Sequence, residues 1–133
     1  MPHEAQDSPD PLRWLAYARS DLALARTEAG PEVFLSSLCF HAQQAAEKSV
    51  KAVLLHRGTP FPRTHSLRRL LALLPADCPR PADEAEVASL TEFAVEARYP
   101  MDLEPVTDEE YRRAVAVAAA VLEWAERLIE RQE

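Results

Sequence analysis

The chain has 133 residues, of which 47% are hydrophobic and 28% charged, and its formal net charge is −7. This length suits one domain with its own core. The negative net charge argues against a general nucleic-acid binder, so DNA is not an expected partner. A local basic site is still compatible with the negative net charge. No apolar segment reaches the roughly 18 residues of a membrane span, and the polar start is unlike a signal peptide, so we expect a cytoplasmic protein with no membrane partner.

The chain is predicted to begin with a loose lead-in and a first helix. Residues 1–11 are polar and contain three prolines, and residues 12–132 are treated as one helical domain. Residues 12–29 carry apolar side chains at helical spacing, and Gly30 marks the end of this helix.

Residues 34–57 are predicted to form the central helix. The segment has no glycine or proline and is followed directly by Gly58, a residue type that commonly ends helices. Apolar residues cover most of its circumference, which indicates packing on several sides. The remaining arc is a polar ribbon, with Glu47 beside it, formed by His41, Gln44, Lys48 and Lys51.

Two interpretations of this polar ribbon stay open. In the first, the ribbon is a solvated helix edge, in which Glu47 and Lys51 form an i,i+4 ion pair worth at most about 0.5 kcal/mol. In the second, it is a cationic strip that faces a groove and binds phosphate or an acidic partner.

A short helix and a stiff connector are predicted next. Thr64 is a candidate N-cap for a helix over residues 65–74, and residues 75–81 contain three prolines. Of the two cysteines, Cys39 in the central helix is expected to be a buried free thiol and Cys78 in the connector a surface thiol.

Two further helices complete the prediction. Asp83 and Glu86 form a candidate capping box for a helix that ends near Arg98, and Thr107 begins a last helix that extends to about residue 131. This last helix has a second apolar stripe, which indicates either deep packing or a subunit interface. The second stripe consists of Val117, Val121, Trp124 and Leu128. The predicted fold is all-α, an up-and-down helical bundle of four long helices plus one short helix.

Common catalytic and metal-binding patterns are missing from the sequence. There is no Glu-x-x-His pair, glycine-rich phosphate loop, Cys-x-x-Cys pair or serine nucleophile elbow, so we expect neither a metal site nor a cofactor. Basic residues bracket one connection, namely Arg57, Arg63, His65, Arg68 and Arg69. Arg98 and Tyr99 close another helix. Both groups fit an ordinary solvated surface or helix cap, and both also fit a phosphate or nucleobase contact.

Four motifs in order resemble the HEPN domain family. They are AR-x-DL-x-LA at residues 18–25, F-x-x-QQAAEKSVKAVL at residues 40–54, TH-x-L-x-x-LL at residues 64–71 and ARYP at residues 97–100. The last motif resembles the RYP-containing type that is associated with MNT nucleotidyltransferases. The resemblance implies a helical bundle that forms homodimers and pairs with an MNT-type nucleotidyltransferase in a toxin–antitoxin-like system.

Many members of this family are metal-independent ribonucleases with an Arg-x(4–6)-His motif, and here the chain departs from the pattern. No histidine follows Arg98 at the required distance, while His65 stands too far after Arg57 and in a different connection. Nuclease activity therefore does not carry over directly. The remaining catalytic hypothesis pairs Arg98 with His41 or His65 across the fold.

Three functions follow as hypotheses. The first is a homodimer of the HEPN type that binds a nucleotide, an RNA or a nucleotidyltransferase. The second is a divergent metal-independent ribonuclease, and the third is a helical adaptor that docks a protein on the second stripe of the last helix. For the first, the expected ligand contacts are His41, Gln44, Lys48, Lys51, Arg98 and Tyr99.

Overall fold

The computed structural model describes residues 10–28, 30–94 and 106–130, and within these ranges every regular element is a helix. The elements are α2 (Pro11–Ala25), α3 (Leu35–His56), α4 (Leu67–Ala72), α5 (Glu84–Ser89), the 3₁₀ helix η1 (Leu90–Phe93) and α6 (Asp108–Glu130). Among the described residues, no helix is both long and apolar enough to cross a membrane.

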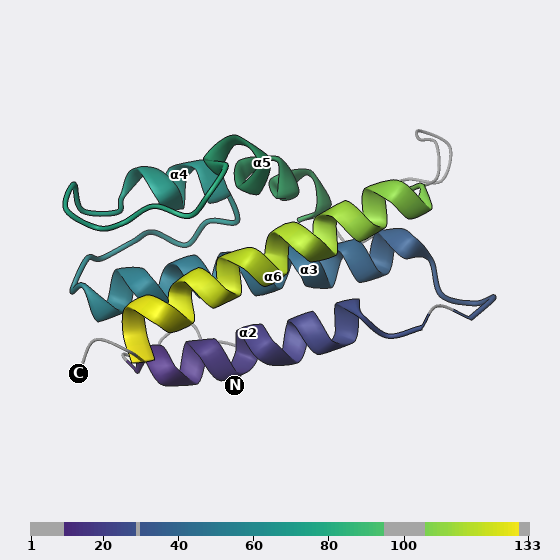
Figure 1. Ribbon diagram of the computed structural model, residues 1–133, viewed down its shortest axis with the longest axis horizontal. Coiled ribbons are helices and arrows are strands. Elements are labelled where there is room, and N and C mark those ends of the chain that lie inside the picture. Colours follow the sequence, from purple (N-terminus) through teal and green to yellow (C-terminus); the bar gives the residue numbers. More distant parts are fainter. Residues whose placement is uncertain (1–9, 29, 95–105, 131–133) are drawn as a thin grey trace.

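The chain runs up and down along the bundle. It passes along α2, returns along α3, goes forward through α4 and α5, and returns along α6 (Figure 1). Because α5 continues directly into η1, residues 84–93 act as one helical segment, so the bundle has four longer segments and the short α4. The all-α prediction is confirmed, and the observed order agrees with the predicted up-and-down arrangement.

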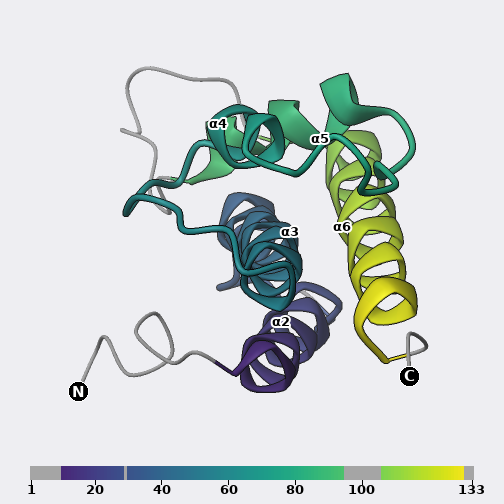
Figure 2. The ribbon, with the colours of Figure 1, turned by 90° about the vertical axis from the view of Figure 1, so that its left-hand side faces the viewer.

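Helix α3 lies at the centre of the bundle. It contacts α2, α6, α4 and η1, and the end-on view shows it surrounded by these elements (Figure 2). Its bounds differ by one residue at each end from the predicted range of 34–57. Gly58 adopts a left-handed conformation with φ of 72° directly after the helix, which a residue without a Cβ accepts at little cost.

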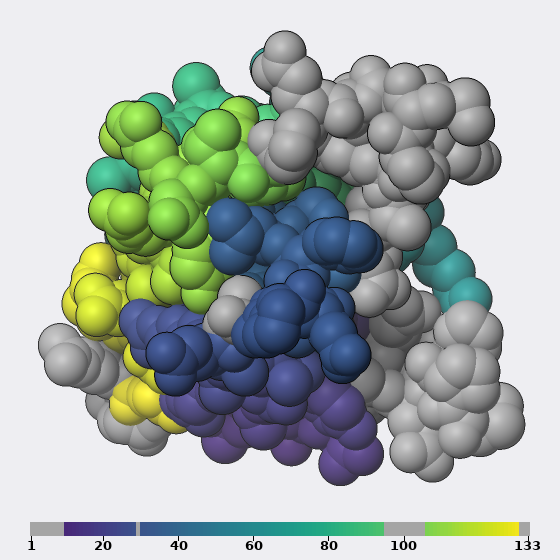
Figure 3. All heavy atoms as spheres, turned by 90° about the vertical axis from the view of Figure 1, so that its right-hand side faces the viewer, coloured from purple at the N-terminus to yellow at the C-terminus, as the bar shows by residue number. Residues whose placement is uncertain are grey.

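The start of α6 is held against the other long helices at one end of the molecule. There the start of α6 lies beside the start of α3 and the end of α2 (Figure 3). The hydroxyl of Tyr111 donates a hydrogen bond to the carbonyl of Ala25. Thr107 and Glu110 form the predicted capping box, in which each backbone N–H donates to the other's side chain, at 2.9 and 3.0 Å. This capping prediction is confirmed.

Other helix ends differ from the prediction. The side chain of Asp10 caps α2, so Pro11 is its first residue and not part of a lead-in, and α2 ends at Ala25, before the predicted boundary. Ser66, and not Thr64, caps α4, because its hydroxyl accepts from the backbone N–H of residue 69 at 3.2 Å. Asp83 caps α5 as predicted, but the α-helix ends at Ser89 and continues only as η1, while residues 95–98 lie outside the described residues.

Most of the second apolar stripe of α6 is buried within the chain itself. Val121, Trp124 and Leu128 belong to the core, and the indole N–H of Trp124 donates to the carbonyl of Pro79 at 2.9 Å. The connector therefore covers Trp124, and three of the four stripe residues are packed in the core, whereas Val117 is only half-buried. Cys78 in the connector is also buried, contrary to the expected surface thiol, and this burial raises its pKa.

Candidate functional site

The polar ribbon of α3 is divided into two clusters in the structure. One cluster surrounds Asp21 of α2, and the other surrounds Glu47 of α3 itself. Each carboxylate binds one lysine of the ribbon and one histidine. The ribbon is therefore neither a simple solvated edge nor a strip of uncompensated positive charge.

The Asp21 cluster joins α2 to α3 near the surface. One carboxylate oxygen of Asp21 accepts a hydrogen bond from Lys48 Nζ at 2.6 Å, and the other lies 3.1 Å from His41 Nδ1. Tyr17, one turn before Asp21, is 38% exposed. Two cations approach its ring, with Arg13 Cζ at 5.5 Å and Lys48 Nζ at 5.8 Å from the ring centroid. These distances fit cation–π contacts.

Sequence reasoning missed Tyr17 and Asp21 as members of this site. The sequence does contain a pattern that groups them. Arg13, Tyr17 and Asp21 follow one another at intervals of four residues and therefore share one face of α2. Nothing in that spacing shows that the face lies against the polar arc of α3. Only the packing of the two helices brings the residues together.

The Glu47 cluster is a buried hydrogen-bond network. Glu47 is 2% exposed, and its carboxylate accepts from Lys51 Nζ at 2.8 Å and from Gln43 Nε2 at 2.9 Å. His65 Nδ1 lies 3.0 Å away, and Gln44 Nε2 lies 3.4 Å away. Burial acts to raise the pKa of Glu47, but the charge of Lys51 and the hydrogen bonds together outweigh it, so the pKa is lowered. Glu47 is therefore ionised.

Lys51 lies below the surface and not along a groove. It is 3% exposed, and its ammonium group lies 5.6 Å from the ring centroids of both Trp14 and Phe61. With Glu47 as its counter-charge, this lysine is fully engaged inside the fold. Lys51 was predicted to be a ligand contact, but at this depth it is not accessible to a ligand.

His65 is oriented by Glu47 but exposed on its outer side. Its side chain is 60% exposed, and Nδ1 faces the ionised carboxylate. Since a carboxylate can only accept, Nδ1 of the neutral ring carries the proton and Nε2 is left as an acceptor. The same reasoning applies to His41 beside Asp21, although that ring is less exposed.

The remaining candidate residues are placed as follows. His41, Gln44 and Lys48 are all partly exposed along α3. Arg57 Nη1 lies 3.8 Å from a carboxylate oxygen of Asp77. The predicted contacts Arg98 and Tyr99 lie outside the described residues. In the described part of the chain, no group of three or more His, Cys, Asp or Glu is arranged to hold a metal ion.

The fold and this site define an all-helical bundle protein with two histidine–carboxylate contacts, each made by a residue of α3. A model of the HEPN domain family matches residues 12–128. The chain therefore belongs to the HEPN domain family. Comparison with curated proteins and with solved structures gave no significant match.

Proposed function

We propose that this HEPN protein is a homodimeric module that binds single-stranded RNA or nucleotides at the surface of the Asp21 cluster. The observation that carries the proposal is the exposed ring of Tyr17 with Arg13 and Lys48 within 6 Å of its centroid. Stacking of a base on an aromatic ring is worth about 1–3 kcal/mol, and neighbouring cations attract the backbone phosphates. Gln44 and His41 add polar contacts along the same helix.

Local geometry, and not overall charge, supports this binding. The chain has a net charge of −7, and Asp21 neutralises much of the charge of Lys48. Stacking and hydrogen bonding therefore carry more of the affinity than long-range attraction. The acceptor Nε2 atoms of His41 and His65 suit a 2′-hydroxyl donor, which favours RNA over DNA.

The family resemblance extends this proposal to partners. We include an MNT-type nucleotidyltransferase as the protein partner in a toxin–antitoxin-like pair in the cytoplasm. Arg98 and Tyr99 stay part of the proposal as further ligand contacts.

Replacing Tyr17 with alanine is expected to weaken RNA binding by about 5- to 150-fold, the equivalent of one stacked base. Fluorescence anisotropy with a short labelled oligouridine measures the affinity. The matched control is Tyr17→Phe, which keeps the ring and is expected to bind nearly as well as the parent. Absence of binding by the parent, or equal binding by the alanine variant, would overturn the proposal.

A second candidate function is metal-independent RNA cleavage, and the contact between Glu47 and His65 favours it. The contact fixes the ring so that the exposed Nε2 can take the proton from a 2′-hydroxyl as its oxygen attacks the adjacent phosphate. The bond from phosphorus to the 5′-oxygen breaks in the same step, and the leaving 5′-oxygen takes a proton from water. His41 is the alternative base, and Arg98 is the proposed cation for the developing charge on phosphate.

Cleavage of RNA in the presence of a metal chelator tests this second function. The parent is expected to form products with 2′,3′-cyclic phosphate ends, and His65→Ala to lower the rate by about 10²- to 10⁴-fold. His56→Ala is the matched control, since His56 is an exposed histidine at the end of α3. A parent that leaves RNA intact rejects the ribonuclease and leaves the binding proposal standing.

A further inference from the structure

Helix α6 carries an exposed seam on the side away from the core. The seam consists of six exposed residues along one line of the helix. Successive members are four, three, four, three and four positions apart, which is the spacing of a coiled-coil contact line. We call this line the α6 outer seam; it consists of Glu109, Arg113, Ala116, Ala120, Glu123 and Arg127. In the end-on view α6 stands at the edge of the bundle, and its outer side faces away from the other helices (Figure 2).

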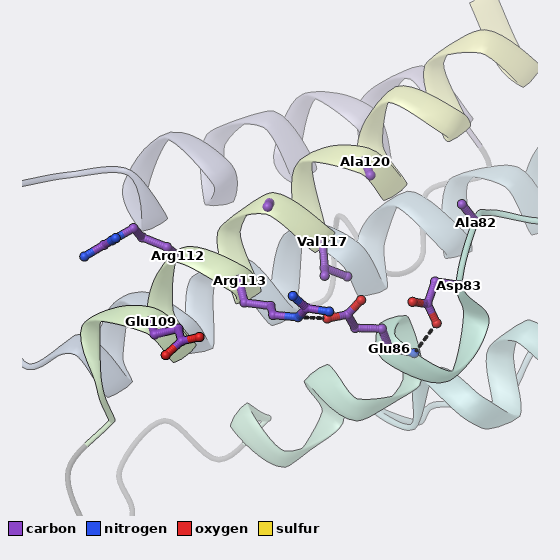
Figure 4. Close-up of a pocket in the computed structure, with 9 residues that line it drawn as sticks. Ala82, Asp83, Glu86, Glu109, Arg112, Arg113, Val117 and Ala120 are labelled. Atoms are coloured by element: carbon purple, nitrogen blue, oxygen red, sulfur yellow. Dashed lines mark hydrogen bonds and ion pairs between the residues drawn. The ribbon is translucent and has the colours of Figure 1, made fainter.

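The middle of the seam borders a groove between α5 and α6. The groove has a volume of about 490 Å³, and Ala82, Ala116, Val117 and Ala120 contribute its apolar lining. Arg113 extends from α6 to form an ion pair with Glu86 at one side of the groove (Figure 4). Small side chains in the middle of the seam would let another helix approach closely.

The charges of the seam are arranged symmetrically with opposite sign. The seam residues are placed symmetrically about Ala118 in the sequence. The two alanines are two positions from it, one on each side. Arg113 and Glu123 are each five positions from it, and Glu109 and Arg127 are each nine positions from it. An antiparallel copy of the same helix therefore sets Glu109 against an arginine and Arg113 against a glutamate. A parallel copy would instead set like charges against each other.

From this charge complementarity we propose that the occupant of the seam is a second copy of this chain, with the two α6 helices antiparallel and a two-fold axis near Ala118. The alanines of the two copies pack at the centre, and each end carries the pair of Glu109 with the partner subunit's Arg127. Arg113 keeps N–H donors for the partner subunit's Glu123, because its side chain is mostly exposed and guanidinium has five donors. This inference rests on the proposed homodimer and identifies its interface.

Such a dimer leaves the proposed RNA surface open. Its contacts Arg13, Tyr17 and Lys48 lie on α2 and α3, and none of them belongs to the α6 outer seam. Dimer formation and RNA binding can therefore be measured independently of each other.

Charge reversal with rescue tests the antiparallel arrangement. Arg127→Glu sets like charges together at both ends of the seam and is expected to raise the dimer dissociation constant by about tenfold or more. The double variant Glu109→Arg/Arg127→Glu restores opposite charges and is expected to dimerise like the parent. Sedimentation equilibrium at low salt measures the constants, and added salt is expected to weaken the parent dimer.

A steric variant provides the second measurement. Ala120→Arg places a long cation at the centre of the seam and is expected to give a folded monomer. Ala23→Arg, at an exposed alanine on α2, is the matched control and is expected to stay dimeric. A dimer that survives both Ala120→Arg and Arg127→Glu overturns this interface but leaves the homodimer, whereas a monomeric parent overturns both. Neither result decides whether Tyr17 binds RNA.

Discussion

Replacing Glu47 with leucine is expected to lower the free energy of unfolding by about 3–5 kcal/mol, the cost of leaving a buried charge without its partner. Lys51 would keep its position between Trp14 and Phe61, with no carboxylate to balance it. Urea unfolding followed by circular dichroism at neutral pH measures the loss. A single variant as stable as the parent would show that Lys51 escapes to solvent at no cost.

The double variant Glu47→Leu/Lys51→Met serves as the control for this charge effect. Removing both charges of a buried pair is often neutral or stabilising, so most of the stability lost in the single variant should return. The recovery is expected to be incomplete by about 1 kcal/mol, because Gln43 and His65 also lose their acceptor. A double variant as unstable as the single one would assign the loss to packing and not to charge.

The second large effect is expected for Trp14→Ala, at about 3–5 kcal/mol of unfolding free energy. Trp14 is fully buried, and its ring meets Phe61 edge to face with centroids 6.2 Å apart. Removing the indole leaves a cavity at the junction of α2, α3 and the connection that follows α3, and it also removes one aromatic neighbour of Lys51.

Thermal and urea unfolding of Trp14→Ala and Trp14→Phe measure this contribution. The phenylalanine variant keeps a ring and much of the volume, so its loss should be clearly smaller. If the alanine variant lost less than about 1 kcal/mol, well below the usual cost of truncating a buried tryptophan, this junction would not be part of the stabilising core.

Local patterns allowed much of the fold to be predicted from sequence. The absence of glycine and proline before Gly58 gave the bounds of α3 to within one residue at each end. The pairing of Thr107 with Glu110 fixed the start of α6, because a capping box depends only on residues close in sequence. The start of α4 was predicted less well, because two hydroxyl residues near it could each cap the helix. The prediction chose Thr64, whereas Ser66 caps the helix in the structure.

The candidate site was predicted only in outline, because its interactions join distant segments. Helical periodicity placed His41, Lys48 and Lys51 on one arc, but it could not show that Asp21 of α2 lies against that arc. Nor could it show that Lys51 is buried. The connector has no periodicity at all, which is why the covering of Trp124 and the burial of Cys78 could not be foreseen.

The positions of the two tryptophans give the protein a built-in optical probe of two separate regions. Trp14 senses the junction of α2 with α3, whereas Trp124 senses the connector through its contact with Pro79. Since the chain has only these two, a variant that keeps one of them emits from a single known location. Trp14→Phe thus makes intrinsic fluorescence a label-free reporter of whether the connector lifts from α6 before the helices separate.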